Sequence, residues 1–340
     1  MNTNVIGIDL AKSVFHLVLL NSAGKVIRKR KLRRNQLAAY VADLEPCLIA
    51  MEACGGAHHW ARTFQELGYQ VSLLPPQHVK GYLRGQKNDY NDALAIAEAA
   101  THSAVRSVAI KTIEQQDAQA LHRIRRQLVG EKTRLTNQVR GLLAEYGIVI
   151  RQGDSAFRTE VVRLIDADAS NLSPQFRNFL ARQYQRFLSL EDEIKWYKNQ
   201  LQQQAKSDEV CNRLSEIPGF GPIISSAFKS WIGTGRQFNN GREASAALGL
   251  IPRQQSTGGK PVLLGISKRG DSELRSLLIH GARSVARRAV DKTDRLSLWF
   301  NRLASRRGFN KAVVALANKL VRMGWVIVAR GEKYQPAIPA

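Results

Sequence analysis

The chain has 340 residues, 44% of them hydrophobic, and its 51 Lys and Arg against 28 Asp and Glu give a net charge of +23. This length supports two or three folded domains, and so large a positive charge is typical of proteins that bind a polyanion such as nucleic acid. No apolar run of membrane-spanning length and no signal-peptide pattern is found, and three cysteines without metal-binding spacing argue against a zinc site or a disulfide framework. We therefore expect a cytoplasmic nucleic-acid-binding protein with no membrane partner.

The first hundred residues are predicted to contain most of the strands. The runs at 5–8, 14–20 and 25–32 are rich in β-branched and aliphatic residues, and a turn signal at 21–24 joins the last two into a hairpin. A short apolar strand at 47–51, a helix at 58–67, a strand at 69–74 and a helix at 91–105 follow. A meander followed by alternating strands and helices predicts a mixed sheet with helices on its faces.

The middle of the chain is predicted to form two long helices. The first carries leucines every seven residues, and the second carries a similar apolar repeat after a Ser173-Pro174 cap. We expect an antiparallel coiled-coil hairpin or a dimerisation arm, the alternative being two helices packed on a domain. The repeats consist of Leu121, Leu128, Leu135 and Leu142, and of Phe187, Leu190, Ile194, Tyr197 and Leu201.

The last third of the chain is basic and mainly helical. The stretch Ile217-Pro218-Gly219-Phe220-Gly221 resembles a helix-hairpin-helix turn, in which Gly219 and Gly221 would present backbone N–H groups to a phosphate, although it could also be an ordinary turn. Residues 251–310 contain 13 Lys and Arg against 4 Asp and Glu. The expected organisation is a domain at 1–110, a coiled-coil region at 111–207 and a C-terminal domain at 208–340.

Four carboxylates of the N-terminal domain are candidate metal ligands. Asp9 interrupts the apolar run VIGIDLAKSVFHLVLL, Glu52 ends the strand at 47–51, and Asp89 and Asp92 are spaced to share one face of a helix start. Taken singly, Asp9 could be a turn residue, Glu52 a strand-end charge, and Asp89 or Asp92 a helix cap. Together they would repel one another unless a cation joined them, and such hard oxygen ligands suit Mg²⁺ or Mn²⁺. The predicted site is a metal centre for chemistry at phosphorus.

A polar, glycine-rich loop in the C-terminal domain places Ser256 between Arg253 and Lys260. The two cations could neutralise charge on a phosphate, but a serine hydroxyl is a poor nucleophile unless a base or a metal removes its proton. Neither cation is a good base. Taken by itself, this stretch is expected to be a solvated loop.

Six stretches together resemble the DEDD-type transposases of bacterial insertion sequences, in particular the insertion sequence 110 family and its 1111 branch. The resemblance implies an α/β N-terminal domain of RNase H-like (RuvC resolvase-like) fold, a coiled-coil arm and a mainly helical C-terminal transposase domain. It also implies that the four acids bind metal and that Ser256, or Thr257 if the register differs by one, attacks DNA to form a covalent phosphoserine link. The stretches span nearly the whole chain and are GIDLAKSVFHL, AMEACGGAHHWA, KNDYNDALAIAEA, LSEIPGFGPI, LGLIPRQQSTGGK and LGISKRGDSELRSLLIHGARS.

The same resemblance implies the partners. These are donor and target DNA, a structured bridge RNA that pairs with both, and further copies of the chain, which form a dimer that assembles to a tetramer with shared active sites. Delegating sequence choice to base pairing would explain the strong charge without a sequence-reading helix, and we expect a bacterial, nucleoid-associated location. From the charge pattern, phosphate contacts with steep salt dependence are expected from Arg28, Arg30, Arg253, Lys260, Lys268, Arg269, Arg275 and Arg283. For Arg28 and Arg30 the alternative is a solvated strand edge.

The expected function is therefore an RNA-guided DNA transposase. The main alternative is a metal-dependent endonuclease of Holliday-junction type, which would use water as nucleophile and form no covalent adduct. An ATP-using phosphotransferase is less consistent with the sequence, because no glycine-rich phosphate loop follows Asp9. A non-catalytic nucleic-acid-binding protein would leave the four acids unexplained.

Overall fold

The computed structural model describes residues 4–86, 88–166, 172–257 and 260–336. The chain divides into two compact units, Met1–Thr112 and Ile113–Ala340, each with its own hydrophobic core. The predicted division into three domains, at 1–110, 111–207 and 208–340, stays a prediction.

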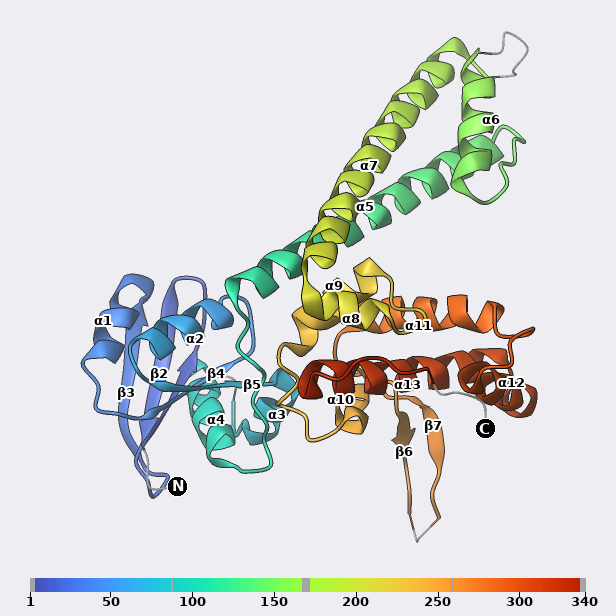
Figure 1. The fold of residues 1–340 in the computed structure, drawn as a ribbon. Helices are drawn as coiled ribbons and strands as arrows, with labels where there is room; N and C mark the ends of the chain where they lie inside the picture. Colours follow the sequence, from blue (N-terminus) through green and yellow to red (C-terminus); the bar gives the residue numbers. More distant parts are fainter. Residues whose placement is uncertain (1–3, 87, 167–171, 258–259, 337–340) are drawn as a thin grey trace. The chain divides into compact units, whose positions relative to one another are not determined.

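The first unit is built on a five-stranded sheet of order β3-β2-β1-β4-β5 (Figure 1). Strand β1 (Val5–Asp9) pairs antiparallel with β2 (Val14–Leu20), which pairs antiparallel with β3 (Val26–Arg33). On its other side β1 runs parallel to β4 (Leu48–Glu52), and β4 runs parallel to β5 (Gln70–Leu74). The predicted meander and mixed sheet are confirmed, and this arrangement is the RNase H-like fold.

Helices cover both faces of this sheet. Ile6 and Ile8 point to the face covered by α1 (Leu37–Ala42) and α2 (Ala57–Glu66), since alternate side chains of a strand point to opposite sides. The other face is covered by α4 (Asp89–Thr101). The remaining short elements are η1 (Arg34–Gln36), α3 (Pro76–Val79) and η2 (Lys80–Tyr82).

Helix α4 lies unusually close to the sheet at the middle of β1. A Cβ atom added to Gly7 would lie 2.1 Å from the carbonyl oxygen of Ala93 and 2.8 Å from the Cβ of Ala97. Only glycine on the strand and small residues on the helix permit this approach. The close contact fixes where α4 begins, and its first turn carries Asp89 and Asp92.

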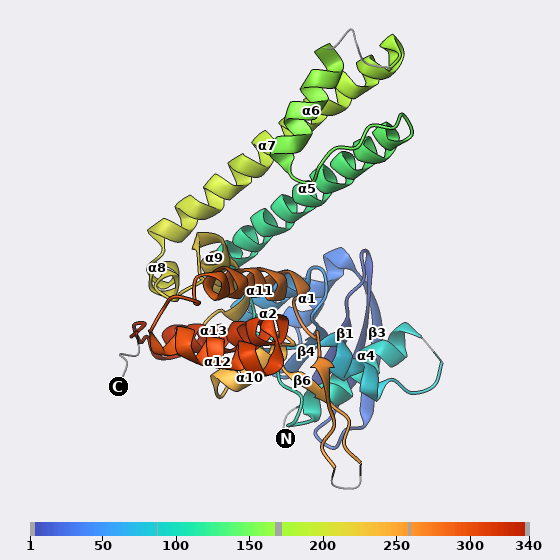
Figure 2. The same ribbon diagram turned by 90° about the vertical axis from the view of Figure 1, so that its right-hand side faces the viewer.

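The second unit carries a long helical arm. Helices α5 (Ile113–Ala144) and α7 (Pro174–Ser207) run side by side, and α6 (Asp154–Asp166) packs against α7 toward the far end (Figures 1 and 2). The predicted cap is confirmed, because the Ser173 hydroxyl accepts a hydrogen bond from the backbone N–H of Phe176 at 3.2 Å.

The buried seam of α5 departs from the predicted seven-residue repeat. Leu128 and Leu135 are buried as expected, but Leu142 is 47% exposed and the next buried positions are Val139 and Leu143. A straight α-helix has 3.6 residues per turn, so its buried stripe drifts away from a strict seven-residue spacing. The seam therefore follows steps of four residues where α5 packs on α6 and α7.

The rest of the second unit is a helical domain organised around α13 (Phe309–Arg330). This helix is long and apolar enough to be a candidate membrane span, but half of its most apolar window is buried among other helices, as in the core helix of a folded domain. The other helices are α8 (Glu209–Ser215), α9 (Pro222–Ile232), α10 (Gly241–Ala247), α11 (Ser272–Arg287) and α12 (Arg295–Arg307).

A two-stranded hairpin of β6 (Pro252–Gln254) and β7 (Leu263–Ile266) extends away from these helices (Figure 2). Both strands are exposed almost throughout, and Leu263 is 65% exposed. The described part of the hairpin therefore presents Ser256 to solvent.

Candidate active site

The register of the sheet brings Asp9, Glu52 and His16 onto the face covered by α4. Asp9 and Glu52 each directly follow the last matched pair of the parallel β1–β4 ladder, Ile8 opposite Met51. His16 lies directly opposite Asp9 on the antiparallel strand β2, and opposite residues of a ladder share a face. The two carboxylates predicted from separate strands thus end up side by side with an imidazole.

The first turn of α4 adds the other two acids. Asn88 is the N-cap, and its side-chain oxygen accepts a hydrogen bond from the backbone N–H of Tyr90 at 2.8 Å. Because Asn88 has this role, the alternative that Asp89 or Asp92 caps the helix is wrong. Both aspartates instead lie inside the first turn, where the partial positive charge of the helix N-terminus favours a carboxylate.

Three side chains are close enough to share one metal ion. One ligand atom each from Asp9, His16 and Asp89 lie within 4.8 Å of one another. The Nδ1 atom of His16 is 3.4 Å from a carboxylate oxygen of Asp89, and its ring packs edge-on against Tyr90 with centroids 4.9 Å apart. Tyr90 therefore helps to fix the orientation of the imidazole.

The electrostatics of the site indicate missing positive charge. The pKa of Asp9 is raised to about 6, chiefly by burial and then by the negative charges of Asp92, Asp89 and Glu52, while His16 opposes the rise. Burial and the charge of Asp92 also raise the pKa of Glu52. Burial and mutual repulsion make it unfavourable for these carboxylates to be ionised together. Their oxygen atoms are a donor set that fits a divalent cation, and a bound cation would lower their pKa values.

His16 is the site residue that sequence reasoning missed. Within the apolar run of β2 it looks like an ordinary core histidine, and nothing in the spacing relates it to Asp9. The relation depends on the ladder register, which the tight connection between β1 and β2 fixes. Pairing residues 5–9 with residues 14–20 as a hairpin would have placed His16 opposite Asp9, but only if the register of that pairing had been chosen correctly.

The same register separates the basic residues of β3 into two faces. Lys31 lies opposite His16 and Lys29 opposite Val18, so both share the face of the acids, and the Lys29 amine lies 5.8 Å from the Tyr90 ring centroid. Arg28 and Arg30, which the sequence singled out for phosphate contact, lie opposite Leu19 and Leu17 on the other face. A nucleic-acid strand at the acidic site would therefore meet the lysines rather than those arginines.

Ser256 is exposed on the β6–β7 hairpin, as expected for a solvated loop. Its hydroxyl accepts a hydrogen bond at 2.9 Å from the side-chain amide of Gln254, and Arg253 and Lys260 on the same hairpin are exposed. The two glycines of this glycine-rich loop, Gly258 and Gly259, lie outside the described residues. An amide donor cannot remove the hydroxyl proton, so a base or metal must come from elsewhere.

The remaining candidates for phosphate contact differ in exposure. Lys268 and Arg269 are exposed and Arg283 is half-buried. Arg275 does not fit the prediction, because it is buried and its Nη1 donates to the carbonyl oxygens of Leu248 at 3.0 Å and Arg269 at 2.8 Å. It braces the turn before α11 instead of facing solvent.

The two glycines of the predicted hairpin turn have different environments. Gly219 has φ +88°, and a Cβ there would lie 2.9 Å from the carbonyl oxygen of Gly281 on α11, so close packing already requires glycine. Gly221 has nothing within 4 Å of an added Cβ and precedes α9 as its N-cap. Only Gly221 therefore lacks a packing reason to be glycine.

Comparison with known proteins relates both units to one group of proteins. Residues 6–148 match a family model of DEDD transposases of the IS110 type, and residues 211–296 match a model described as transposase IS116/IS110/IS902 family. Together these matches include all four acids and Ser256.

Relatives match over nearly the full chain. The transposase for insertion sequence element IS1111A of Coxiella burnetii is 45% identical over 97% of this chain and 91% of its own length. A probable family 20 transposase of Pseudomonas aeruginosa is 43% identical over 99% of this chain and 100% of its own. The solved structure of Thermus thermophilus RuvC aligns with 31% of this chain and 99% of RuvC, at 17% identity and a TM-score of 0.26.

Proposed function

Because this chain belongs to the IS116/IS110/IS902 family of transposases, we propose that it cuts and rejoins DNA at a metal centre formed by Asp9, Glu52, Asp89 and Asp92. The observation that carries the proposal is the convergence of two strand ends and one helix start on a single face of the sheet. A structural role would not require four acids to gather where burial and mutual repulsion raise the pKa of Asp9 to about 6.

The protein's part in this chemistry is to hold ligands in place. Asp9 and Glu52 sit at the ends of paired strands, and Asp89 and Asp92 on a helix whose position Gly7 fixes, so all four belong to rigid elements. When bound, Mg²⁺ or Mn²⁺ would supply Lewis-acid stabilisation of charge at phosphorus. Lys29 and Lys31 on the neighbouring strand would attract the phosphate backbone toward this face.

We further propose Ser256 as the nucleophile. Its Oγ would attack a phosphorus atom, forming the Oγ–P bond as one phosphodiester P–O bond breaks, with the Oγ proton lost and the leaving sugar oxygen protonated. Attack of a sugar hydroxyl on the phosphoserine would reverse these changes and rejoin the strands. The family membership and the exposure of the hydroxyl on a projecting hairpin support this role. Arg253 and Lys260 on the same hairpin would stabilise charge on the phosphate.

The metal centre is tested by strand cleavage of a DNA that carries the ends of the chain's own element. Glu52→Gln and Asp92→Asn should each reduce Mg²⁺-dependent cleavage by a factor of at least a hundred while leaving DNA affinity within about twofold. Glu66→Gln on the exposed end of α2 removes the same charge from the same unit and is the matched control. Full cleavage by Glu52→Gln would refute the proposed centre.

The serine role is tested by trapping the covalent intermediate. Denaturation of a stalled reaction should yield a protein–DNA adduct, which Ser256→Ala should abolish and Thr257→Ala should preserve. An adduct lost only in Thr257→Ala would move the role to that residue. Cleavage without any adduct, unaffected by Ser256→Ala, would favour the alternative, an endonuclease of Holliday-junction type that uses water.

The proposed guide and assembly need separate tests. The large positive charge supports a bridge RNA partner, and the helical arm of α5, α6 and α7 supports oligomerisation through it into a dimer and tetramer. Sequencing of the nucleic acid that copurifies with the chain, expressed with its native flanking DNA, should recover one discrete structured RNA. Random cellular fragments would count against a guide, and a monomer by light scattering with that RNA bound would count against the assembly.

A further inference from the structure

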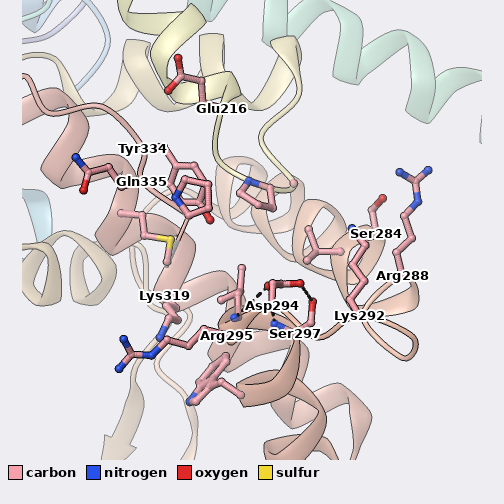
Figure 3. A pocket seen from close by; sticks show the side chains of 17 residues that line it. Glu216, Ser284, Arg288, Lys292, Asp294, Arg295, Ser297, Lys319, Tyr334 and Gln335 are labelled. Atoms are coloured by element: carbon pink, nitrogen blue, oxygen red, sulfur yellow. Dashed lines mark hydrogen bonds between the residues drawn. The ribbon is translucent and has the colours of Figure 1, made fainter. Parts of the chain in front are cut away.

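The helical domain of the second unit contains a cavity of about 770 Å³ between the Pro218-Gly219 turn, α11, α12 and α13 (Figure 3). Its volume is within the range of small-ligand pockets, which is roughly 300–1,000 Å³. None of the residues predicted from the sequence to bind metal or to attack DNA lines it. Its wall residues with charged side chains are Glu216, Arg288, Lys292, Asp294, Arg295 and Lys319.

The net charge of this cavity is positive, because its four basic side chains outnumber its two acidic ones. Of its two acids, Asp294 is already engaged, because it caps α12 by accepting hydrogen bonds from the backbone N–H of Ser297 at 3.0 Å and from the Ser297 hydroxyl at 2.6 Å. These bonds lower the pKa of Asp294 and hold it ionised. Among the described residues, none of the four cations lies within 4 Å of a carboxylate oxygen.

The cations approach the cavity from different elements. In Figure 3, Lys319 and Arg295 lie on one side of Asp294, and Arg288 and Lys292 lie on the other. The Lys319 amine lies 4.7 Å from the ring centroid of Trp299, which holds it in place by a cation–π contact. Burial, together with the charges of Arg322 and Arg295, lowers the pKa of Lys319. The domain thus maintains several cations together at a cost that a bound anion would relieve.

A second hollow lies next to the cavity. A space of about 510 Å³ shares Lys319 and Met323 with it and adds Arg242 and Arg322. Cations that line two neighbouring spaces suit a chain of phosphates better than a single small anion. Guanidinium groups also match the geometry of phosphate oxygens.

We propose that this cavity, together with the neighbouring hollow past Lys319, binds the phosphodiester backbone of an unpaired nucleic-acid strand; we call the two spaces the strand pocket. Spaces of these volumes are too small to admit a double helix. The inference rests on the proposed function, since it assigns a second contact surface to the nucleic acid on which the metal centre acts. RNA and DNA strands share the phosphodiester backbone that the strand pocket would recognise, so the experiment compares a DNA probe with an RNA probe.

The test uses the full chain and fluorescein-labelled 12-nucleotide single strands of mixed sequence, one of DNA and one of RNA, in anisotropy titrations at several salt concentrations. Lys319→Gln and Arg295→Gln should each weaken binding of at least one of these strands about five- to tenfold. Each should also reduce the slope of log affinity against log salt by about 0.7, the value for one lost contact to a single strand. Arg302→Gln, an equal charge change at an exposed position of α12 outside the cavity, should change affinity less than twofold.

The comparison of DNA with RNA identifies which strand is bound. A loss confined to the RNA probe would assign the strand pocket to RNA, and a loss confined to the DNA probe would assign it to unpaired DNA. Equal, small losses for Lys319→Gln and Arg302→Gln would overturn the inference while leaving the proposed function intact. Failure of the wild-type chain to bind any nucleic acid, including duplex DNA, would overturn both.

A second measurement needs no variant and so does not depend on the folding of a mutant. Acetylation of the wild-type chain by an amine reagent, read by mass spectrometry, reports the accessibility of each lysine. The bound strand should reduce acetylation of Lys319 at least threefold more than that of Lys311, an exposed lysine near the start of the same helix. Equal protection of the two lysines would contradict binding in the cavity.

Discussion

Replacement of Asp9 by Asn should stabilise the metal-free protein at neutral pH, although it removes a proposed ligand. The folded pKa of Asp9 is raised from 3.8 to about 6. A carboxyl with a raised pKa destabilises the fold when it ionises, so the penalty is absent below about pH 4 and complete above about pH 6. A shift of about two units corresponds to about 3 kcal/mol, and because Asp9 is only about half buried, solvent screening reduces this to about 1 kcal/mol.

The assay is thermal unfolding of Asp9→Asn and wild type in a metal chelator from pH 4 to pH 8. One kcal/mol in a unit of this size corresponds to a rise of about 5 °C in the Tm of the first unit. The rise should vanish near pH 4, and saturating Mg²⁺ should reverse the order by stabilising only the wild type. Glu66→Gln should show no such pattern. A destabilised Asp9→Asn protein at pH 7 without metal would refute the electrostatic reasoning.

Three further predictions follow from the same coordinates. Gly7→Ala should destabilise the first unit by about 1–3 kcal/mol in urea unfolding and weaken metal binding, because the added Cβ would lie 2.1 Å from a backbone oxygen of α4. An unchanged urea midpoint would show that α4 can move away freely. His16→Gln should lower the affinity for Mn²⁺ more than that for Mg²⁺ in calorimetric titrations, since imidazole suits transition metals, and equal losses would exclude His16 as a ligand. His122 is buried and hydrogen-bonded to the Ser226 hydroxyl at 3.1 Å, and burial lowers its pKa to about 4. Because the unfolded chain takes up a proton at this histidine near pH 6.5 and the folded chain does not, the free energy of unfolding should fall by on the order of 3 kcal/mol as the pH drops from about 6.5 to 4. His122→Asn should lose less stability than wild type over that interval, and parallel pH profiles would contradict this assignment.

The sequence allowed elements of both units to be predicted where each has a local signal. The strand β2 is a continuous apolar run, α2 begins after two glycines, and α7 begins at a Ser-Pro cap, and all three are present. The departure in the arm has a physical reason. A seven-residue repeat predicted Leu142 in the seam, but the natural period of a straight helix places Leu143 there instead.

The four acids could be selected from the sequence, but their surroundings could not. Asp9 and Glu52 are conspicuous because a carboxylate is costly in an apolar run. His16, Lys29 and Lys31 have no such local signal, since their relation to the acids depends on how β1, β2 and β3 are aligned. A shift of β3 by one residue relative to β2 would replace Lys29 and Lys31 with Arg28 and Arg30 on the face of the sheet that carries the acids.

By itself, the sequence determined the classes of element, the acidic candidates and the charge that implies a nucleic-acid partner. Each of these follows from residue type and short-range spacing. The tertiary structure alone decided which side chains share a face, that Arg275 turns inward, and that Arg288, Lys292, Arg295 and Lys319 surround one cavity. Those relations join residues far apart in the chain, and only strand register and helix packing bring such residues together.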